Sequence, residues 1–241
     1  LAALVALGIA AIVAAYLLID IPKPNDRAVS QASVLYYSDG KTEMDRIATV
    51  NRESVELEEV PEGVQHAFIA AEDRSFYDNR GISPKGIFRA VSGAVAGEDR
   101  GGGSTITQQY VKNYFLTQDQ TLERKGREIL LSIKIDGELS KDEILANYLN
   151  TIYLGRRSYG VEVAAQNYFG KSAKDLDLAE SALLAAMIQR PGAADPAENP
   201  EMYQDRFDYV IKSMVDEGFI TQEQADQLVS SVRSALAIDL D

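Results

Sequence analysis

GGGSTITQQYVKN, at residues 101–113, marks the start of a helix. Three consecutive glycines disfavour helix before it, because ordering a glycine costs more backbone entropy than ordering any other residue. Ser104 or Thr105 can then cap a new helix with its hydroxyl oxygen. Ile106 and Tyr110 point toward a core on such a helix. A separate stripe, at spacings of three and four, carries polar groups: Thr105, Gln108, Gln109 and Lys112.

This polar stripe has two interpretations. Hydroxyl, amide and ammonium groups beside a helix amino terminus can bind phosphate and sugar hydroxyls, because the helix end adds partial positive charge. A polar stripe on an amphipathic helix is, however, more often only its solvated face. The helical pattern alone does not separate the two interpretations.

The composition excludes several classes of function. The net charge of −13 argues against nucleic-acid binding and requires a local basic patch for any phosphate ligand. The absence of cysteine excludes disulfides and thiol chemistry. The single histidine, His66, makes a histidine-rich metal site or a Ser-His-Asp triad improbable, and we expect its role to be structural.

Residues 1–19 contain no charged residue and consist mostly of Ala, Leu, Val and Ile. A helix of this length approaches the roughly 30 Å thickness of a membrane's hydrocarbon layer. We therefore predict a transmembrane helix over 1–19, with a buried core helix as the alternative.

Residues 20–60 are predicted to form a lead-in with short strands at Ser33–Tyr37 and Arg46–Val50, joined by a turn at Asp39-Gly40. Residues 61–241 form the main domain.

Acidic residues stand at the end of one predicted helix and inside another. Pro61 suits a helix start, and Glu72 and Asp73 follow an apolar helical pattern. In the predicted helix 122–135, Arg124 and Glu128 are spaced i, i+4. Without further information, the first pair is a solvated edge and the second a surface ion pair. A capping box, Ser140 to Glu143, begins the next helix.

Four separated motifs resemble those of the family 51 peptidoglycan glycosyltransferases, which occur in class A penicillin-binding proteins and in monofunctional relatives. The motifs are GGSTITQQ followed by KN, the E-D-x-x-F pattern from Glu72, R-K-x-x-E from Arg124, and YLNTIYLG at 148–155. The resemblance covers roughly Val60 to Leu228, and the motifs occur in the family's order. This chain departs from the family pattern at Asn79, Ser83 and Asp136, where relatives commonly have His, Asp and Glu.

This resemblance implies a mainly α, lysozyme-like fold with two lobes around a cleft, after the N-terminal transmembrane helix. It implies an enzyme that polymerises lipid II into β-1,4-linked glycan strands with inversion and releases undecaprenyl pyrophosphate. The protein is expected in the bacterial cell membrane, single-pass, with its catalytic domain on the extracytoplasmic side. Expected partners are lipid II, the growing glycan strand, membrane lipid, moenomycin-type inhibitors and cell-wall synthesis proteins. The segment Arg206 to Leu228 resembles the lead-out of the bifunctional type.

The resemblance also assigns roles to individual residues. Glu72 is the expected general base, and Glu128 is the expected second carboxylate, which positions the pyrophosphate or a divalent ion, Mg or Mn. No organic cofactor is expected. The residues expected to bind substrate are Asp73, Phe76, Ser104, Thr105, Gln108, Gln109, Lys112, Asn113, Arg124, Lys125, Asn150 and Tyr153.

Two rival functions stay open at this point. A lysozyme-like glycan-cleaving enzyme would also use a carboxylate in a helical protein, but it needs no cations for a pyrophosphate. Lys112, Arg124 and Lys125 argue against it. A membrane-anchored cell-wall interaction module would keep the fold without turnover. The presence of both Glu72 and Glu128 argues against that rival.

Overall fold

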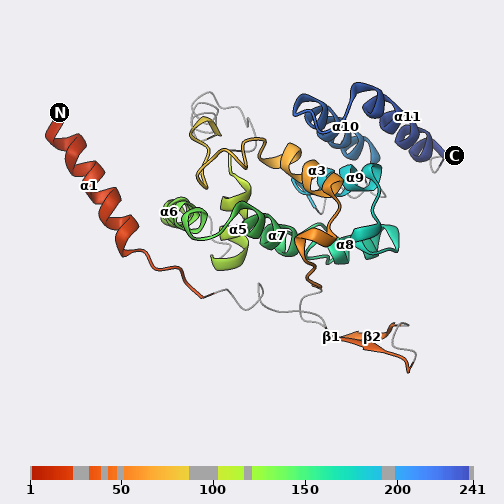
Figure 1. Ribbon diagram of the computed structural model, residues 1–241, viewed down its shortest axis with the longest axis horizontal. Helices are drawn as coiled ribbons and strands as arrows, with labels where there is room; N and C mark the ends of the chain where they lie inside the picture. Colours follow the sequence, from red (N-terminus) through yellow and green to blue (C-terminus); the bar gives the residue numbers. More distant parts are fainter. Residues whose placement is uncertain are drawn as a thin grey trace. The chain divides into compact units, whose positions relative to one another are not determined.

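The computed structural model describes residues 2–23, 33–38, 43–47, 52–86, 103–116, 121–191 and 199–238 (Figure 1). The described chain is mainly helical, as predicted, and it divides into two compact units. Unit 1 comprises Leu1–Val29 and Ser75–Ile144, and unit 2 comprises Ser30–Arg74 and Leu145–Asp241. The division of the chain into segments 1–19, 20–60 and 61–241 stays a prediction.

Unit 1 is built around two packed helices. Helix α5, Ile106–Phe115, lies against α6, Leu122–Glu138, and α1, Ala2–Leu18, contacts α6 more lightly. The Lys134 ammonium donates a hydrogen bond to the Ile19 carbonyl oxygen at 2.6 Å, which ties the end of α1 to α6. Helix α7, Lys141–Thr151, begins in unit 1 and ends in unit 2.

The predicted transmembrane helix is shorter in the structure than in the prediction. Helix α1 contains 17 residues and no charged residue. Within the described residues, no helix combines the length and the apolar character needed to cross a membrane.

Unit 2 has its core among three helices that pack on one another: α3, Glu62–Glu72, α9, Leu178–Met187, and α10, Pro200–Asp216. Helix α8, Val161–Phe169, contacts α9, and α11, Gln222–Ile238, contacts α10. Two short 3₁₀ helices complete this set, η1 at Leu57–Glu59 and η2 at Ala173–Asp175.

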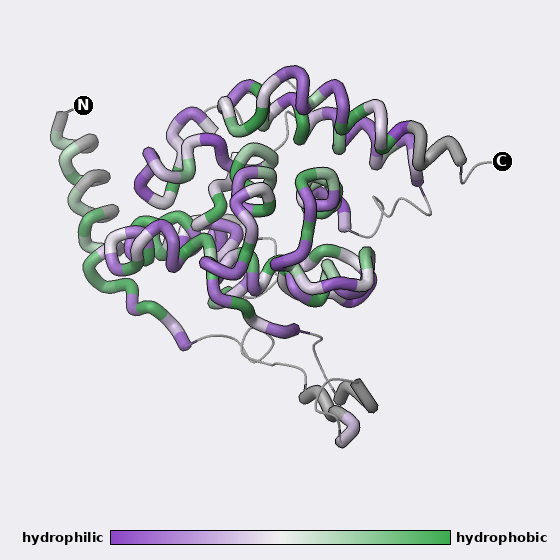
Figure 2. Tube along the Cα trace, turned by 45° about the vertical axis from the view of Figure 1, so that its right-hand side comes forward, coloured by the Kyte–Doolittle hydropathy of each residue, from purple (hydrophilic) through white to green (hydrophobic). Residues whose placement is uncertain are grey.

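The sequence of α10 shows why these helices pack as they do. Its buried residues Phe207, Val210, Ile211 and Met214 recur at helical spacing, so one side of the helix enters the core. Hydrophobic and hydrophilic positions alternate along α10 and α11 in Figure 2, as expected for amphipathic helices.

The single histidine, His66, stacks on Phe219 with ring centroids 4.1 Å apart, so its role is structural, as predicted.

The helix boundaries follow local capping signals. Thr105, one of the two candidates that the sequence offered, caps α5 with its hydroxyl. Ser140 and Glu143 form the predicted capping box before α7, with Ser140 N donating to Glu143 Oε2 at 2.8 Å and Glu143 N donating to Ser140 Oγ at 3.2 Å. Pro61 is the residue that precedes α3.

The predicted strands pair as an antiparallel hairpin. Strand β1, Ser33–Tyr36, faces β2, Glu43–Ile47, with Ser33 opposite Ile47. The second strand begins earlier than the predicted Arg46. The Asp39-Gly40 turn lies outside the described residues, as do the first two glycines of the 101–113 stretch.

Candidate active site

The amino-terminal end of α5 forms a closed hydrogen-bonded cap in unit 1. The Thr105 hydroxyl accepts a hydrogen bond from Gln108 N at 3.1 Å, and Thr105 N donates to Gln108 Oε1 at 3.1 Å. The Thr105 hydroxyl also donates to the Gly81 carbonyl oxygen at 2.7 Å. Thr105 and Gln108 are buried. The interpretation of the stripe as a merely solvated face is therefore wrong at this end of the helix.

The predicted second carboxylate, Glu128, lies at the centre of a polar cluster in unit 1. Its side chain is only 2% exposed. Arg124 Nη1 donates to Glu128 Oε2 at 2.8 Å, and Gln108 Nε2 donates to Glu128 Oε1 at 3.3 Å. The Lys125 ammonium forms an ion pair with the same carboxylate. The pattern-based expectation of an exposed Arg124–Glu128 pair is wrong, because α5 covers the carboxylate.

This cluster carries an excess positive charge. Lys125 also donates to Ser104 Oγ at 2.9 Å, so its ammonium joins α6 to the residue that precedes the Thr105 cap of α5. Two cations, Arg124 and Lys125, surround one carboxylate. The Arg124 Nε–H is buried and has no hydrogen-bond partner in the structure. The cluster therefore combines a net cationic charge with a desolvated donor, which suits an anionic ligand.

Other residues of the predicted stripe lie farther along α5. Gln109, Lys112 and Asn113 are half-buried. The structure connects six predicted residues of unit 1 through hydrogen bonds and ion pairs. These cluster residues are Ser104, Thr105, Gln108, Arg124, Lys125 and Glu128.

The donor set around Glu128 does not fit a protein-made site for a divalent ion. The carboxylate already accepts from Arg124, Lys125 and Gln108, none of which is a ligand for Mg or Mn. Within the ranges that the structure describes, no group of three or more Asp, Glu, His or Cys residues is placed to hold a metal. A divalent ion at Glu128 stays a prediction, and this donor set does not support it.

Asn79, one of the three departures from the family pattern, lies in a loop that hydrogen bonds brace in unit 1. Asn79 Oδ1 accepts from Gly81 N at 3.0 Å and from the Lys141 ammonium at 3.2 Å. Lys141 also pairs with Asp136, which is buried at the end of α6. Gly81 has a φ of +78°, and a Cβ there would clash with the Ser132 carbonyl oxygen. The loop is thus held against α6 although Asn79 replaces the family's common His.

Replacing Asn79 by Ala is expected to destabilise the protein by about 1–2 kcal/mol, because Gly81 N and the Lys141 ammonium both lose an acceptor. Asn79→Asp keeps an oxygen in the same place and is the matched control, with a smaller expected loss. Thermal unfolding of the three proteins measures the difference. Equal melting temperatures for all three would show that this brace contributes nothing.

Phe76, a predicted substrate-binding residue, is fully buried in the structure. Its side chain is 0% exposed, and the Lys141 ammonium is 4.9 Å from its ring centroid. The ring also contacts Tyr77 edge-on. A substrate-binding role for Phe76 stays a prediction, which the complete burial of the ring does not support.

The predicted base, Glu72, is the last residue of α3 in unit 2. Its side chain is 14% exposed, and its Oε1 lies 3.7 Å from Arg206 Nη2 of α10. Asp73 ends the helix with a buried side chain. Burial, and then the charges of Glu72 and Asp73, raise the pKa of Tyr148 well above its usual value. Its hydroxyl therefore stays protonated beside the two carboxylates.

The two predicted residues of the YLNTIYLG motif have different surroundings. Asn150 Nδ2 donates to Val55 O at 2.8 Å, and Asn150 Oδ1 accepts from Val55 N at 3.0 Å, so its amide holds the segment before α3. Tyr153 is 37% exposed, with its ring 4.9 Å from that of Tyr159. Tyr153 is thus available to a ligand, whereas the Asn150 side chain binds the backbone.

Reasoning from the sequence missed Arg206 and Tyr148 as neighbours of the predicted base. The available signal for Arg206 was its position in α10. It lies directly before the buried Phe207 and three residues after the buried Tyr203. A charged residue at such a position indicates a partner on a neighbouring element.

A sequence model of the transglycosylase family matches residues 40–215, which is nearly three quarters of the chain. The chain belongs to the transglycosylase family. All the residues predicted to act in catalysis or binding lie within this match. Helices α1 and α11 lie outside it.

Several relatives of this transglycosylase have closely similar sequences. Penicillin-binding protein 1A of Mycolicibacterium smegmatis is 45% identical over 89% of this chain and 28% of its own length. Penicillin-binding protein 1A of Mycobacterium tuberculosis is 47% identical over 84% of this chain and 25% of its own length. The transglycosylase chain therefore spans about a quarter of the length of these relatives.

Among solved structures, penicillin-binding protein 1A from Haemophilus influenzae matches with a TM-score of 0.45 and 24% identity. The match covers 88% of this chain and 21% of the other. This likeness is too weak for a comparison of the two folds.

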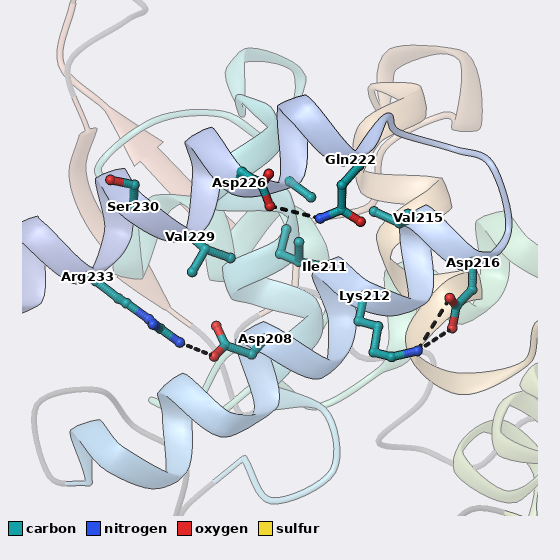
Figure 3. A pocket seen from close by; sticks show the side chains of 11 residues that line it. Asp208, Ile211, Lys212, Val215, Asp216, Gln222, Asp226, Val229, Ser230 and Arg233 are labelled. Carbon is teal, nitrogen blue, oxygen red and sulfur yellow. Dashed lines mark hydrogen bonds and ion pairs between the residues drawn. The ribbon is translucent and has the colours of Figure 1, made fainter.

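A pocket of about 610 Å³ between α10 and α11 of this transglycosylase is separate from the predicted site residues, none of which lines it (Figure 3). Its polar side chains pair with one another. Arg233 binds Asp208 at 2.6 Å, and Lys212 binds Asp216 at 3.0 Å. The floor is formed by aliphatic residues such as Ile211 and Val229. This pocket is therefore not the site that the sequence predicts.

Proposed function

We propose that this chain is a peptidoglycan glycosyltransferase that polymerises lipid II into β-1,4-linked glycan strands with inversion. The family match over residues 40–215 carries the proposal, because it contains every predicted site residue. The names of the relatives, penicillin-binding proteins 1A, support a role in cell-wall synthesis. The polar clusters around Glu72 and Glu128 support it chemically.

Glu72 is the proposed general base. The 4-hydroxyl oxygen of the acceptor disaccharide attacks the anomeric carbon of the donor, and its proton passes to the Glu72 carboxylate. The bond from the anomeric carbon to the phosphate oxygen breaks, and undecaprenyl pyrophosphate leaves with the electron pair. Attack opposite the leaving group inverts an α-phosphate to a β-link. A partly enclosed carboxylate at a helix end, 14% exposed, suits proton transfer.

The Glu128 cluster is the proposed site for the leaving pyrophosphate. Arg124 and Lys125 would neutralise charge that develops on the phosphate oxygens, and the buried Arg124 Nε–H is a further donor. Ser104 and Gln108 orient these groups through the hydrogen bonds described above. Glu128 thus acts by holding the two cations in place. Lys112, Asn113 and Gln109 on α5 are proposed to extend the binding surface toward the sugars.

A lipid-linked substrate requires that the enzyme work at a membrane. The described large apolar residues of α1 are exposed, with Leu7 at 72% and Leu17 at 71%. We propose that residues 1–19 attach the protein to the bacterial cell membrane, with the catalytic domain on the extracytoplasmic side. Moenomycin-type inhibitors and other cell-wall synthesis proteins remain expected partners of the same proposal.

The proposal is tested by incubating the detergent-solubilised protein with labelled lipid II and separating the products by length. Long glycan strands are expected, and purified glycan strands added as substrate should stay intact. Shortened strands would favour the glycan-cleaving rival. Lipid II that binds without any turnover would favour the interaction module and would contradict the proposed reaction.

A further inference from the structure

Arg206 brings a cation from α10 to the end of α3. Its Nη2 lies 3.7 Å from Glu72 Oε1, with only 19% of the arginine side chain and 14% of the glutamate side chain exposed. Both helices belong to unit 2 and pack on each other. The pair therefore joins two elements within one compact unit, in an environment where water screens the charges less than at an open surface.

The Arg206 guanidinium is held from more than one side. Its carbon Cζ lies 4.6 Å from the centroid of the Tyr209 ring, one helical turn along α10. The backbone on either side is anchored because Tyr203 and Phe207 are buried in the core. The Nε–H of Arg206 is buried without a hydrogen-bond partner. An arginine held in this way directs a fixed positive charge at Glu72.

The other surroundings of Glu72 disfavour its ionised form. Glu72 ends α3, where the helix dipole adds partial negative charge. The buried Asp73 carboxylate follows it directly, and Tyr148 nearby is fully buried. Burial and like charge both stabilise a protonated carboxyl, which could not accept a proton from an acceptor hydroxyl. A general base at this position therefore needs a cation.

We propose that Arg206 is a positioning residue that keeps Glu72 ionised and correctly oriented as the base for glycosyl transfer. This inference rests on the proposed function, because it assumes that Glu72 is the base. Arg74, the next cation along the chain from Glu72, is engaged elsewhere. Its Nη2 donates to Ser213 Oγ at 2.6 Å, and its Nη1 pairs with Asp216 at 3.2 Å. Arg206 is thus positioned for a role that Arg74 does not fill.

The test compares the full chain with Arg206→Ala and Arg206→Lys. Lys212→Ala is the matched control, because it removes a cation from the same helix that pairs with Asp216 rather than Glu72. The Glu72 carboxyl is titrated by NMR in each protein labelled with ¹³C-glutamate, with Glu72→Gln used to assign its signal. For Arg206→Ala, the pKa of Glu72 should rise by about one unit or more. Arg206→Lys should restore much of the shift, and Lys212→Ala should leave it unchanged.

The pH profile of lipid II polymerisation gives a second readout. The acid limb of kcat/KM should move to higher pH in Arg206→Ala, so that the rate recovers as the pH is raised. A uniform loss of rate with an unshifted limb and an unshifted Glu72 titration would overturn the inference and leave Arg206 with a packing role. Normal polymerisation by Glu72→Gln would instead overturn the proposed base, and it is a different result from either outcome for Arg206.

Discussion

Replacing Glu72 by Gln is expected to lower the rate of lipid II polymerisation by about 10²–10⁴-fold, the usual contribution of a general base. The two side chains have nearly the same shape, but the amide cannot take up the proton of the acceptor hydroxyl. The binding of lipid II should change much less than the rate, because the cations around Glu128 are untouched. The measurement is the initial rate of glycan formation at saturating lipid II, together with substrate affinity.

The folded state should tolerate the same substitution. Glu72→Gln loses an ion pair at 3.7 Å, but it also removes a negative charge next to Asp73 and at the negative end of α3. The free energy of unfolding should therefore stay within about 1 kcal/mol of the wild-type value. Glu62→Gln, at the exposed start of the same helix, is the control and should keep full activity. A near-normal rate for Glu72→Gln would remove Glu72 from the mechanism.

Helix starts and short-range pairs could be predicted from the sequence, because their physical causes lie within a few residues. The Thr105 cap and the Ser140–Glu143 box each connect positions three apart and form as soon as the helix forms. The position of Glu72 at the end of α3 follows equally from the local apolar pattern and Asp73 after it. The family's motifs pointed to the same residues, and the family membership is confirmed.

Contacts between distant segments could not be predicted from spacing. The pairing of Arg124 with Glu128 was expected from the i, i+4 spacing, but its burial depends on α5, which covers it from another part of the chain. Phe76 is apolar in a motif full of polar residues, and only packing decides whether such a ring meets substrate or core. Asn150 and Arg206 likewise meet their partners through tertiary structure alone.

Replacing Glu128 by Gln should strongly lower the stability of the fold, whereas Glu72→Gln should mainly lower the rate of polymerisation. The cost should be about 3 kcal/mol, because Arg124 and Lys125 lose the buried carboxylate that neutralises them. This cost is at the lower end of the range for removing one partner of a buried ion pair, because 40% of the Lys125 side chain is exposed. The melting temperature should fall by roughly 5–10 °C, measured by calorimetry. Polymerisation should fall as well.

A matched control and a second substitution show whether charge repulsion or packing causes the loss of stability in Glu128→Gln. Glu123→Gln, on the same helix with 78% of its side chain exposed and paired with Arg127, should change stability by less than about 1 kcal/mol. Adding Lys125→Gln to Glu128→Gln should recover part of the lost stability if the two cations repel each other in the single variant. No recovery would mean that Glu128 acts mainly through its hydrogen bonds to α5. In that case the cations would not need the carboxylate, and its proposed role in holding them for the pyrophosphate would be wrong.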